Sequence, residues 1–278
     1  MKRMILTGAL ALVAGVSSLM AQAKTPAPKS KDELAAVQAL FSATRNGPDA
    51  TIKAAEDLLT KYADTDFKDL ALLSEAQAYQ QKRDPEKAQI YAERAIEANP
   101  KNFQATLMLS ELLVQNTREN DLDKEEKLGR AEKYANDTIQ MVNSAPKPNP
   151  QLSDQQWGDA QKDIAAEAHN ALGLSALVRK KYDVAVTEFK TAANSSAHPE
   201  PAYQVREASA LQSAGKYDDA VAICDKVMAD QTVAPQIRQV AQAIRATAIK
   251  SGAKNTNPPP AAAAPAAPAP TPPAEKKQ

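Results

Sequence analysis

The sequence has a single cysteine and two histidines among its 278 residues. One cysteine excludes an intramolecular disulfide, and Cys224, His169 and His198 are together too few for the ligand set of a structural zinc site. We therefore predict that the protein holds no metal ion and no other cofactor.

Motifs of the common catalytic sites are also absent. The chain contains no His-Glu-x-x-His, no Gly-x-Ser-x-Gly, no phosphate-binding loop and no dinucleotide fingerprint. Glu167 and His169 are two positions apart, so on a helix they point to different faces and cannot act as a pair. We predict that the protein is not an enzyme and has no catalytic residues.

Neither sign of charge dominates, since 34 basic residues balance 34 acidic ones. Without a basic field, nucleic acid and anionic lipid are not expected as partners. Aromatic residues make up only 4% of the chain, glycines number 8, and long runs of alternating β-branched residues are missing. This composition favours Ala-rich helix packing over sheets, so we predict an all-α protein.

Residues 69–102 show the helical organisation most clearly. Small and apolar residues recur at helical spacing in two stretches, which are separated by the helix-start signal Asp84-Pro85 and closed by Asn99-Pro100. The predicted hairpin of helices has two apolar faces, formed by Leu72, Ala76 and Tyr79 and by Ala88, Ala92 and Ala95. One hairpin cannot bury both faces alone, so the pattern should recur.

The pattern does recur, and its residues resemble the tetratricopeptide repeat (TPR), a 34-residue helix-turn-helix unit. One clear copy contains Leu172-Gly173 followed by Ala185-x3-Phe189, and another contains Gly215 followed by Ala220-x3-Cys224. In the copy at residues 69–102, Glu75 departs from the family pattern. At the positions of the pattern's large residues, we expect Cys224 to be a small core residue and His169 a packed core histidine.

The resemblance implies an all-α, right-handed superhelical solenoid of four to five stacked helix-turn-helix repeats over residues 31–251, with residues 235–250 as a C-terminal capping helix. In a degenerate first hairpin, we expect Leu34, Val37 and Phe41 to share one packed face. Segments 116–128 and 143–153 interrupt the repeat, and they either lie near the working surface or lengthen turns. Ser153-Asp154 should begin a long helix that continues into the next repeat.

The two ends of the chain differ from the repeats. Residues 1–23 combine Lys2 and Arg3, an apolar run and the small-residue sequence Ala21-Gln22-Ala23, which is typical of a signal peptide; an uncleaved anchor is the alternative. Residues 24–30 are a linker. We expect cleavage near Ala23, a periplasmic or secreted product and no stable membrane insertion. Residues 252–278 are rich in Pro and Ala and predict a disordered tail that is a ligand, a spacer or inert.

The resemblance implies a function in binding, because such solenoids hold an extended peptide or a partner protein on a concave surface lined by the first helix of each repeat. We therefore predict a scaffold or adaptor of the bacterial cell envelope. The Lys and Arg residues with which some relatives bind a C-terminal carboxylate are absent from the expected lining. That lining consists of Leu73, Gln77, Gln80, Gln81, Leu107, Glu111, Gln115, Asn170, Leu174, Leu177, Val205, Ser209 and Gln212.

Two other functions stay open at this stage. The incomplete first repeat and the inserted segments are compatible with a structural subunit that forms homo-oligomers. Trp157 and the tyrosines are compatible with stacking on sugar rings of a cell-wall glycan, although core positions explain most of them.

Overall fold

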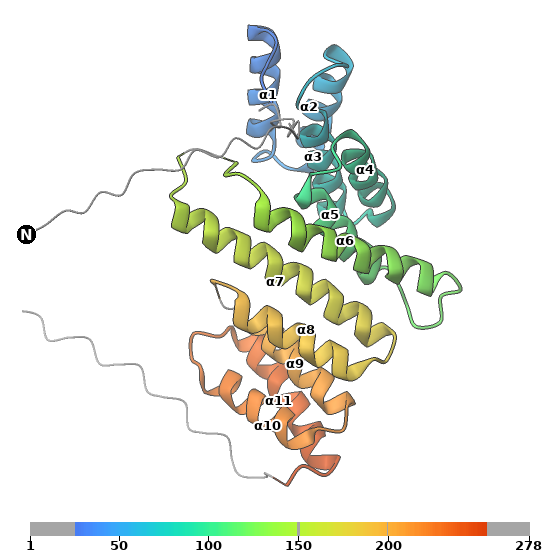
Figure 1. The fold of residues 1–278 in the computed structure, drawn as a ribbon, viewed down its shortest axis with the longest axis vertical. Helices are drawn as coiled ribbons and strands as arrows, with labels where there is room; N and C mark the ends of the chain where they lie inside the picture. The colour runs from blue at the N-terminus through green and yellow to red at the C-terminus, as the bar shows by residue number, and fades with distance from the viewer. Residues whose placement is uncertain (1–25, 149–150, 199, 255–278) are drawn as a thin grey trace, which may run out of the picture.

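A computed structural model describes residues 26–148, 151–198 and 200–254. The predicted signal peptide and residues 255–278 of the predicted tail lie outside this part. The described part is entirely helical and contains no strand, which confirms the predicted all-α class (Figure 1). Its helices are α1 (Lys31–Ala43), α2 (Pro48–Lys61), α3 (Lys68–Gln81), α4 (Pro85–Ala98), α5 (Phe103–Gln115), α6 (Lys124–Ser144), α7 (Asp154–Val178), α8 (Tyr182–Ser195), α9 (Pro201–Ser213), α10 (Tyr217–Ala229) and α11 (Pro235–Lys250).

The helices pack in chain order as five hairpins and one closing helix. Each odd-numbered helix from α1 to α9 packs against the helix that follows it, and the second helix of each hairpin also contacts the first helix of the next. Helix α11 packs on both α9 and α10, as expected of a capping helix. Figure 1 shows this succession from blue α1 to red α11. The described part of the chain is a helical solenoid, as predicted.

Three of the hairpins turn in the same way. The residue two places after the first helix has a left-handed backbone, with φ of 58° at Arg83, 59° at Lys180 and 77° at Gly215. The next N–H then donates to a carbonyl five residues back, which satisfies an orphan carbonyl of the helix end. These hydrogen bonds join Asp84 to Tyr79 (2.9 Å), Lys181 to Ala176 (2.8 Å) and Lys216 to Leu211 (2.9 Å).

Polar contacts at nearly the repeat period connect successive hairpins. Lys82, at the turn after α3, pairs with Asp49 at the start of α2, and Lys216 pairs with Asp183 of α8 at 2.7 Å, both pairs being separated by 33 residues. After α11, the backbone N–H of Lys254 donates to Asp218 of α10 at 2.7 Å. Each contact ties a turn to the second helix of the hairpin before it.

The two interruptions of the repeat lengthen α6 and α7 and the turns beside them. The side-chain hydroxyl of Ser153 accepts from the N–H of Gln156 at 3.1 Å and caps the long helix α7 where the sequence predicts its start. Trp157 donates from Nε1 to the carbonyl of Ala145 at 3.2 Å and is buried. Because the side chain of Trp157 is buried and its ring lies 6.2 Å from the ring of Phe103 of α5, it is not free to stack on a glycan.

The predicted packed face of α1 is wrong at two of its three residues. Leu34 and Phe41 are 41% and 54% exposed, whereas Val37 and Leu40 are buried. Glu33 lies on the buried side, where its carboxylate accepts from the Thr65 hydroxyl at 2.6 Å. The buried face of α1 therefore runs through Glu33, Val37 and Leu40, and one acidic side chain lies among its apolar residues.

The predictions for Cys224 and His169 have different outcomes. Cys224 is fully buried, and burial raises the pKa of its thiol to about 11, so the prediction of an inert core residue is confirmed. His169 is only partly buried, and its Nδ1 lies 2.7 Å from Oε2 of Glu188 on α8. The prediction of a packed core histidine is therefore wrong.

Candidate functional site: a hollow on the first helices

A hollow of about 230 Å³ is formed by the first helices of three successive hairpins, α3, α5 and α7. We call it the first-helix hollow. Larger hollows lie elsewhere on the described part of the chain, among them one of about 660 Å³ at the loops around Pro26 and Pro146 and one of about 570 Å³ between α8, α9 and α10. The first-helix hollow is the one that coincides with the surface expected from the sequence. It is lined by Gln77, Gln80, Gln104, Leu107, Met108, Glu111, Ile164 and Glu167.

Helical spacing explains how these side chains converge. Gln104, Leu107 and Glu111 follow one another at intervals of three and four residues, which places them along one face of α5. The pairs on α3 and α7 are each three residues apart. Three short rows therefore face one another across neighbouring helices.

Asp69 of α3 fixes how α5 enters the array. Its Oδ2 accepts from the side-chain amides of Asn99 at 2.8 Å and Asn102 at 2.9 Å. Asn102 is also the N-cap of α5, since its Oδ1 accepts from the N–H of Ala105 at 3.0 Å. One carboxylate thus ties the α4–α5 turn to α3, and the hollow is held by hydrogen bonds at the helix ends.

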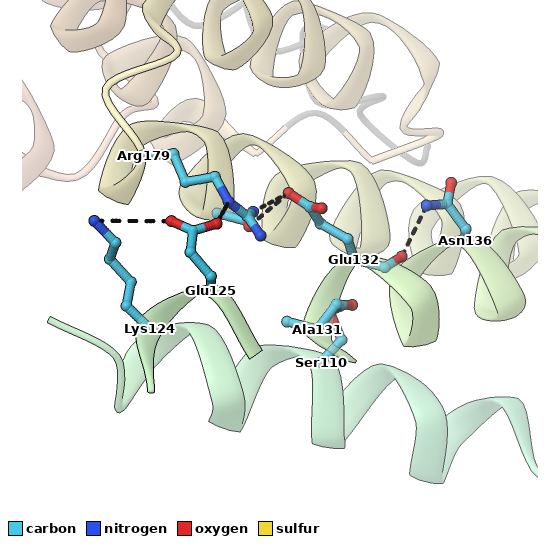
Figure 2. A network of polar contacts seen from close by, with 8 residues as sticks. Ser110, Lys124, Glu125, Ala131, Glu132, Asn136 and Arg179 are labelled. Carbon is cyan, nitrogen blue, oxygen red and sulfur yellow. Dashed lines mark hydrogen bonds and ion pairs between the residues drawn. The ribbon is translucent and has the colours of Figure 1, made fainter. Parts of the chain in front are cut away.

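A network around Arg179 fixes α7 against α6 (Figure 2). The guanidinium donates from Nε to Glu125 at 2.7 Å and from Nη1 to Ser175 at 2.8 Å, and Nη1 also bonds Glu132. Behind it, the Ser110 hydroxyl of α5 donates to the carbonyl of Ala131 of α6 at 2.9 Å. Because these contacts join α5 and α7 through α6, they position two of the three helices that line the hollow.

Carboxyl groups dominate the electrostatics of the hollow. Burial, and then the negative charge of Glu167, raises the pKa of Glu111 to about 7, while Arg206 opposes the shift. Partial desolvation by its neighbours, and then the negative charge of Asp163, raise the pKa of Glu167 as well, although its side chain is exposed. Outside the lining, Tyr203 of α9 is buried and its pKa is raised to about 12, first by burial and then by Glu167.

The structure places the residues of the expected lining in three different environments. Gln77, Gln80, Leu107 and Glu111 come together in the hollow. Gln81 and Gln115 are exposed outside it, and Ser209 and Gln212 are half-buried. Leu174 and Leu177 pack against the core. Leu73, Asn170 and Val205 are buried, so the expectation that they line an open surface is wrong.

Four residues of the hollow were not predicted from the sequence: Gln104, Met108, Ile164 and Glu167. Extending the spacing one turn back from Leu107 would have found Gln104. Ile164 and Glu167 lie in the lengthened helix α7, where the insertion interrupts the repeat register and the spacing gives no signal. Their place in the hollow follows from the packing of α7 on α5.

The arrangement is suited to binding. No group of three or more His, Cys, Asp or Glu residues in the described part of the chain could hold a metal ion. Within that same part, no helix has both the length and the apolarity that crossing a bilayer requires. Side-chain amides at the rim and apolar side chains on the floor can contact a polypeptide backbone and its side chains.

Comparison with known proteins supports the architecture. No protein-family model matches the chain, and no curated protein matches it. The crystal structure of TTC0263, a thermophilic TPR protein of Thermus thermophilus, is similar with a TM-score of 0.50 and 18% identity, over 76% of this chain and 95% of that chain. The chain has a TPR-like helical repeat fold. The assembly chaperone of RpL4 (Acl4, residues 1–338) is a more distant match, with a TM-score of 0.43 and 11% identity over 78% and 97% of the two chains.

Proposed function

We propose that this protein is a non-enzymatic interaction scaffold that binds an extended peptide or a segment of a partner protein in the first-helix hollow. The observation that carries the proposal is the composition of the hollow, which draws all its lining from the first helices of three consecutive hairpins. Repeat folds of this kind use such surfaces for binding.

The chemistry of the hollow suits a polypeptide ligand. Gln77, Gln80 and Gln104 offer both donors and acceptors to a peptide backbone, and all three are exposed. Leu107 and Met108 supply an apolar floor. The helices are held by the contacts of Asp69 and Arg179, so little of the binding free energy is lost in ordering the surface.

We also propose that the scaffold acts in the bacterial cell envelope. The support is the pattern of residues 1–23, with its basic start, apolar run and Ala21-Gln22-Ala23. Fractionation of the native cells followed by N-terminal sequencing tests this: we expect a periplasmic chain beginning near Lys24, and a cytoplasmic chain that retains residues 1–23 would contradict it.

Binding at the hollow is tested by a crosslinking pull-down from the native periplasm with matched glutamine variants. The test variant is Q77A/Q80A/Q104A, and the control is Q236A/Q239A/Q242A, which removes three exposed amides from α11. We expect the test variant to lose partners that the control retains. Partners that depend on residues 255–278 and not on the glutamines would place recognition in the tail and contradict the proposal.

A second candidate function is self-association as a structural subunit. Leu34 and Phe41 are seven residues apart on one side of α1, and both are exposed. Such a pair at the end of the solenoid can stack against a second copy. Light scattering at tens of micromolar should then show a dimer that Phe41→Gln dissociates and that Ile90→Gln, at an exposed apolar residue of α4, leaves intact. A monomeric wild-type chain would rule out this function.

A further inference from the structure

The first-helix hollow carries an excess of negative charge. Glu111 of α5 and Glu167 of α7 both line it, and Glu167 acts on Glu111 strongly enough to help raise its pKa. Asp163, one helical turn before Glu167, raises the pKa of Glu167 in the same way. Two carboxylates from different helices therefore line one small volume, and the negative charge of Glu167 makes ionisation of Glu111 less favourable.

The charge is not neutralised within the lining. The other residues of the hollow are three glutamines, Leu107, Met108 and Ile164, and none of these side chains is basic. Arg206 of α9 lowers the pKa of Glu111 from outside the lining. Its Nη1 donates to Oδ1 of Asn170 at 2.7 Å, so part of its donor capacity is engaged by a buried amide. A ligand that brings a positive charge between Glu111 and Glu167 would relieve their repulsion.

We propose that the occupant of the first-helix hollow is an extended segment of a partner protein that places a Lys or Arg side chain between Glu111 and Glu167. The ammonium or guanidinium group would donate charge-assisted hydrogen bonds to both carboxylates. The methylene stem would lie on Leu107, Met108 and Ile164, since long basic side chains pack their stems on apolar surface. The glutamines would bind the flanking backbone. This inference rests on the proposed function and adds the chemistry of the partner.

The test uses random 12-residue peptides displayed on phage and selected against the full chain. The selected peptides are synthesised in two forms, with the basic residue and with norleucine in its place, and their affinities are measured by fluorescence anisotropy. The protein is compared with E111Q/E167Q and with the control E97Q/E126Q, which neutralises two exposed carboxylates on α4 and α6. Urea unfolding of each variant verifies that the isosteric changes leave the fold intact.

We expect the selected peptides to contain Lys or Arg, and the norleucine form to bind at least about tenfold more weakly, a loss of ~1.4 kcal/mol. E111Q/E167Q should weaken binding by a similar factor, and E97Q/E126Q should not. Peptides that lose affinity with Q77A/Q80A/Q104A but not with E111Q/E167Q would overturn this inference and leave the proposed function standing.

Two other results would also overturn it. Peptides indifferent to both sets of variants would contradict this inference and the proposed function together. If deleting residues 255–278 tightened peptide binding about tenfold, this chain's own Lys276 and Lys277 would be the occupant, and the assignment to an outside partner would fall.

Discussion

Gly173 of α7 lies directly against the ring of Phe189 of α8, with no room for a side chain between them. A Cβ at position 173 would lie 2.6 Å from Cε1 of Phe189, whose side chain is fully buried. This close approach sets the distance between the two helices of the hairpin. It also explains why this copy of the repeat retains the Gly of the family pattern.

Gly173→Ala should therefore destabilise the fold. The added methyl forces the buried ring of Phe189 or the helix backbone to move, and overpacking of this kind costs about 1–3 kcal/mol. Gly129→Ala in α6 is the matched control, because its Cβ would meet nothing within 4 Å. There the change should stabilise by up to ~1 kcal/mol through helix propensity. Urea unfolding measures both, and equal effects at the two positions would contradict the close packing.

Arg179→Ala should loosen the junction of α6 and α7. Removal of a guanidinium that is only 9% exposed leaves Glu132 and Ser175 without their shared partner, and we expect a loss of about 2–3 kcal/mol in the free energy of unfolding. Arg179→Lys should recover only part of it, because an ammonium lacks the planar fork.

The control for Arg179 is the exposed ion pair of Lys133 with Asp137 on the surface of α6, at 2.6 Å. Lys133→Ala should change stability by less than ~0.5 kcal/mol. If Arg179→Ala proved equally mild, the network in Figure 2 would not be what holds the two helices.

Glu75 makes the stability of the fold depend on pH. Its side chain is 1% exposed, Oε2 has no hydrogen-bond partner in the described part of the chain, and burial raises its pKa to about 7. The folded chain binds a proton at the Glu75 carboxyl more tightly than the unfolded chain does. The stability contributed by this protonation is therefore fully present below pH ~4.5 and is lost as the pH rises through 7. The contribution is up to ~3 kcal/mol.

Glu75→Gln should remove most of that part of the pH dependence, so that the variant is more stable than the wild type at pH 8 and similar to it at pH 5. The comparison is made by urea unfolding across pH 4–9. Glu97→Gln, at an exposed residue of α4, serves as the control and should keep the wild-type slope. If the free energy of unfolding varied with pH in parallel for Glu75→Gln and the wild type, Glu75 would be ionised in the folded chain.

Asp163 holds the turn between α8 and α9. Its carboxylate accepts from the Ser196 hydroxyl at 2.7 Å and from the backbone N–H groups of Ala197 and His198. Its Oδ2 also lies 2.6 Å from Nδ1 of His198. Burial opposes ionisation, but these hydrogen bonds prevail and lower its pKa to about 2. Its stabilisation is therefore present above pH ~4 and is lost as the pH falls towards 2.

Asp163→Asn should cost about 1–2 kcal/mol at pH 7 and less than ~0.5 kcal/mol at pH 2. It should also speed amide hydrogen exchange at Ala197 and His198. Asp57→Asn, in the exposed pair of Lys53 and Asp57, is the control and should leave both observables unchanged. Unaltered exchange in Asp163→Asn would contradict its role at the turn.

The sequence predicted the hairpins well because their signals are local. Asp84-Pro85 and Asn99-Pro100 lie at the boundaries of α4, and Ser153 caps α7 as expected. Start and stop residues act within one turn of a helix, so they can be recognised without knowledge of the neighbouring helices.

Which side of a helix stays open could not be predicted so well. Helix α3 contacts both α2 and α4, so it buries residues around more of its circumference than one apolar stripe suggests. Leu73, which was expected on the surface, is therefore buried. Asn170 is buried where Arg206, 36 residues later, donates to it. Such contacts depend on the angle between hairpins, for which the spacing of residues within one helix carries no signal.

The most direct test of the first-helix hollow as the binding surface is site-specific photo-crosslinking in native cells. A photoreactive phenylalanine is placed at Gln80 or Gln104, which line the hollow, and in separate strains at Ile90 or Glu97 on the outer side of α4. We expect one shared crosslinked partner at Gln80 and Gln104 and none at Ile90 or Glu97. A partner captured at the α4 positions, with none at Gln80 and Gln104, would contradict binding in the hollow.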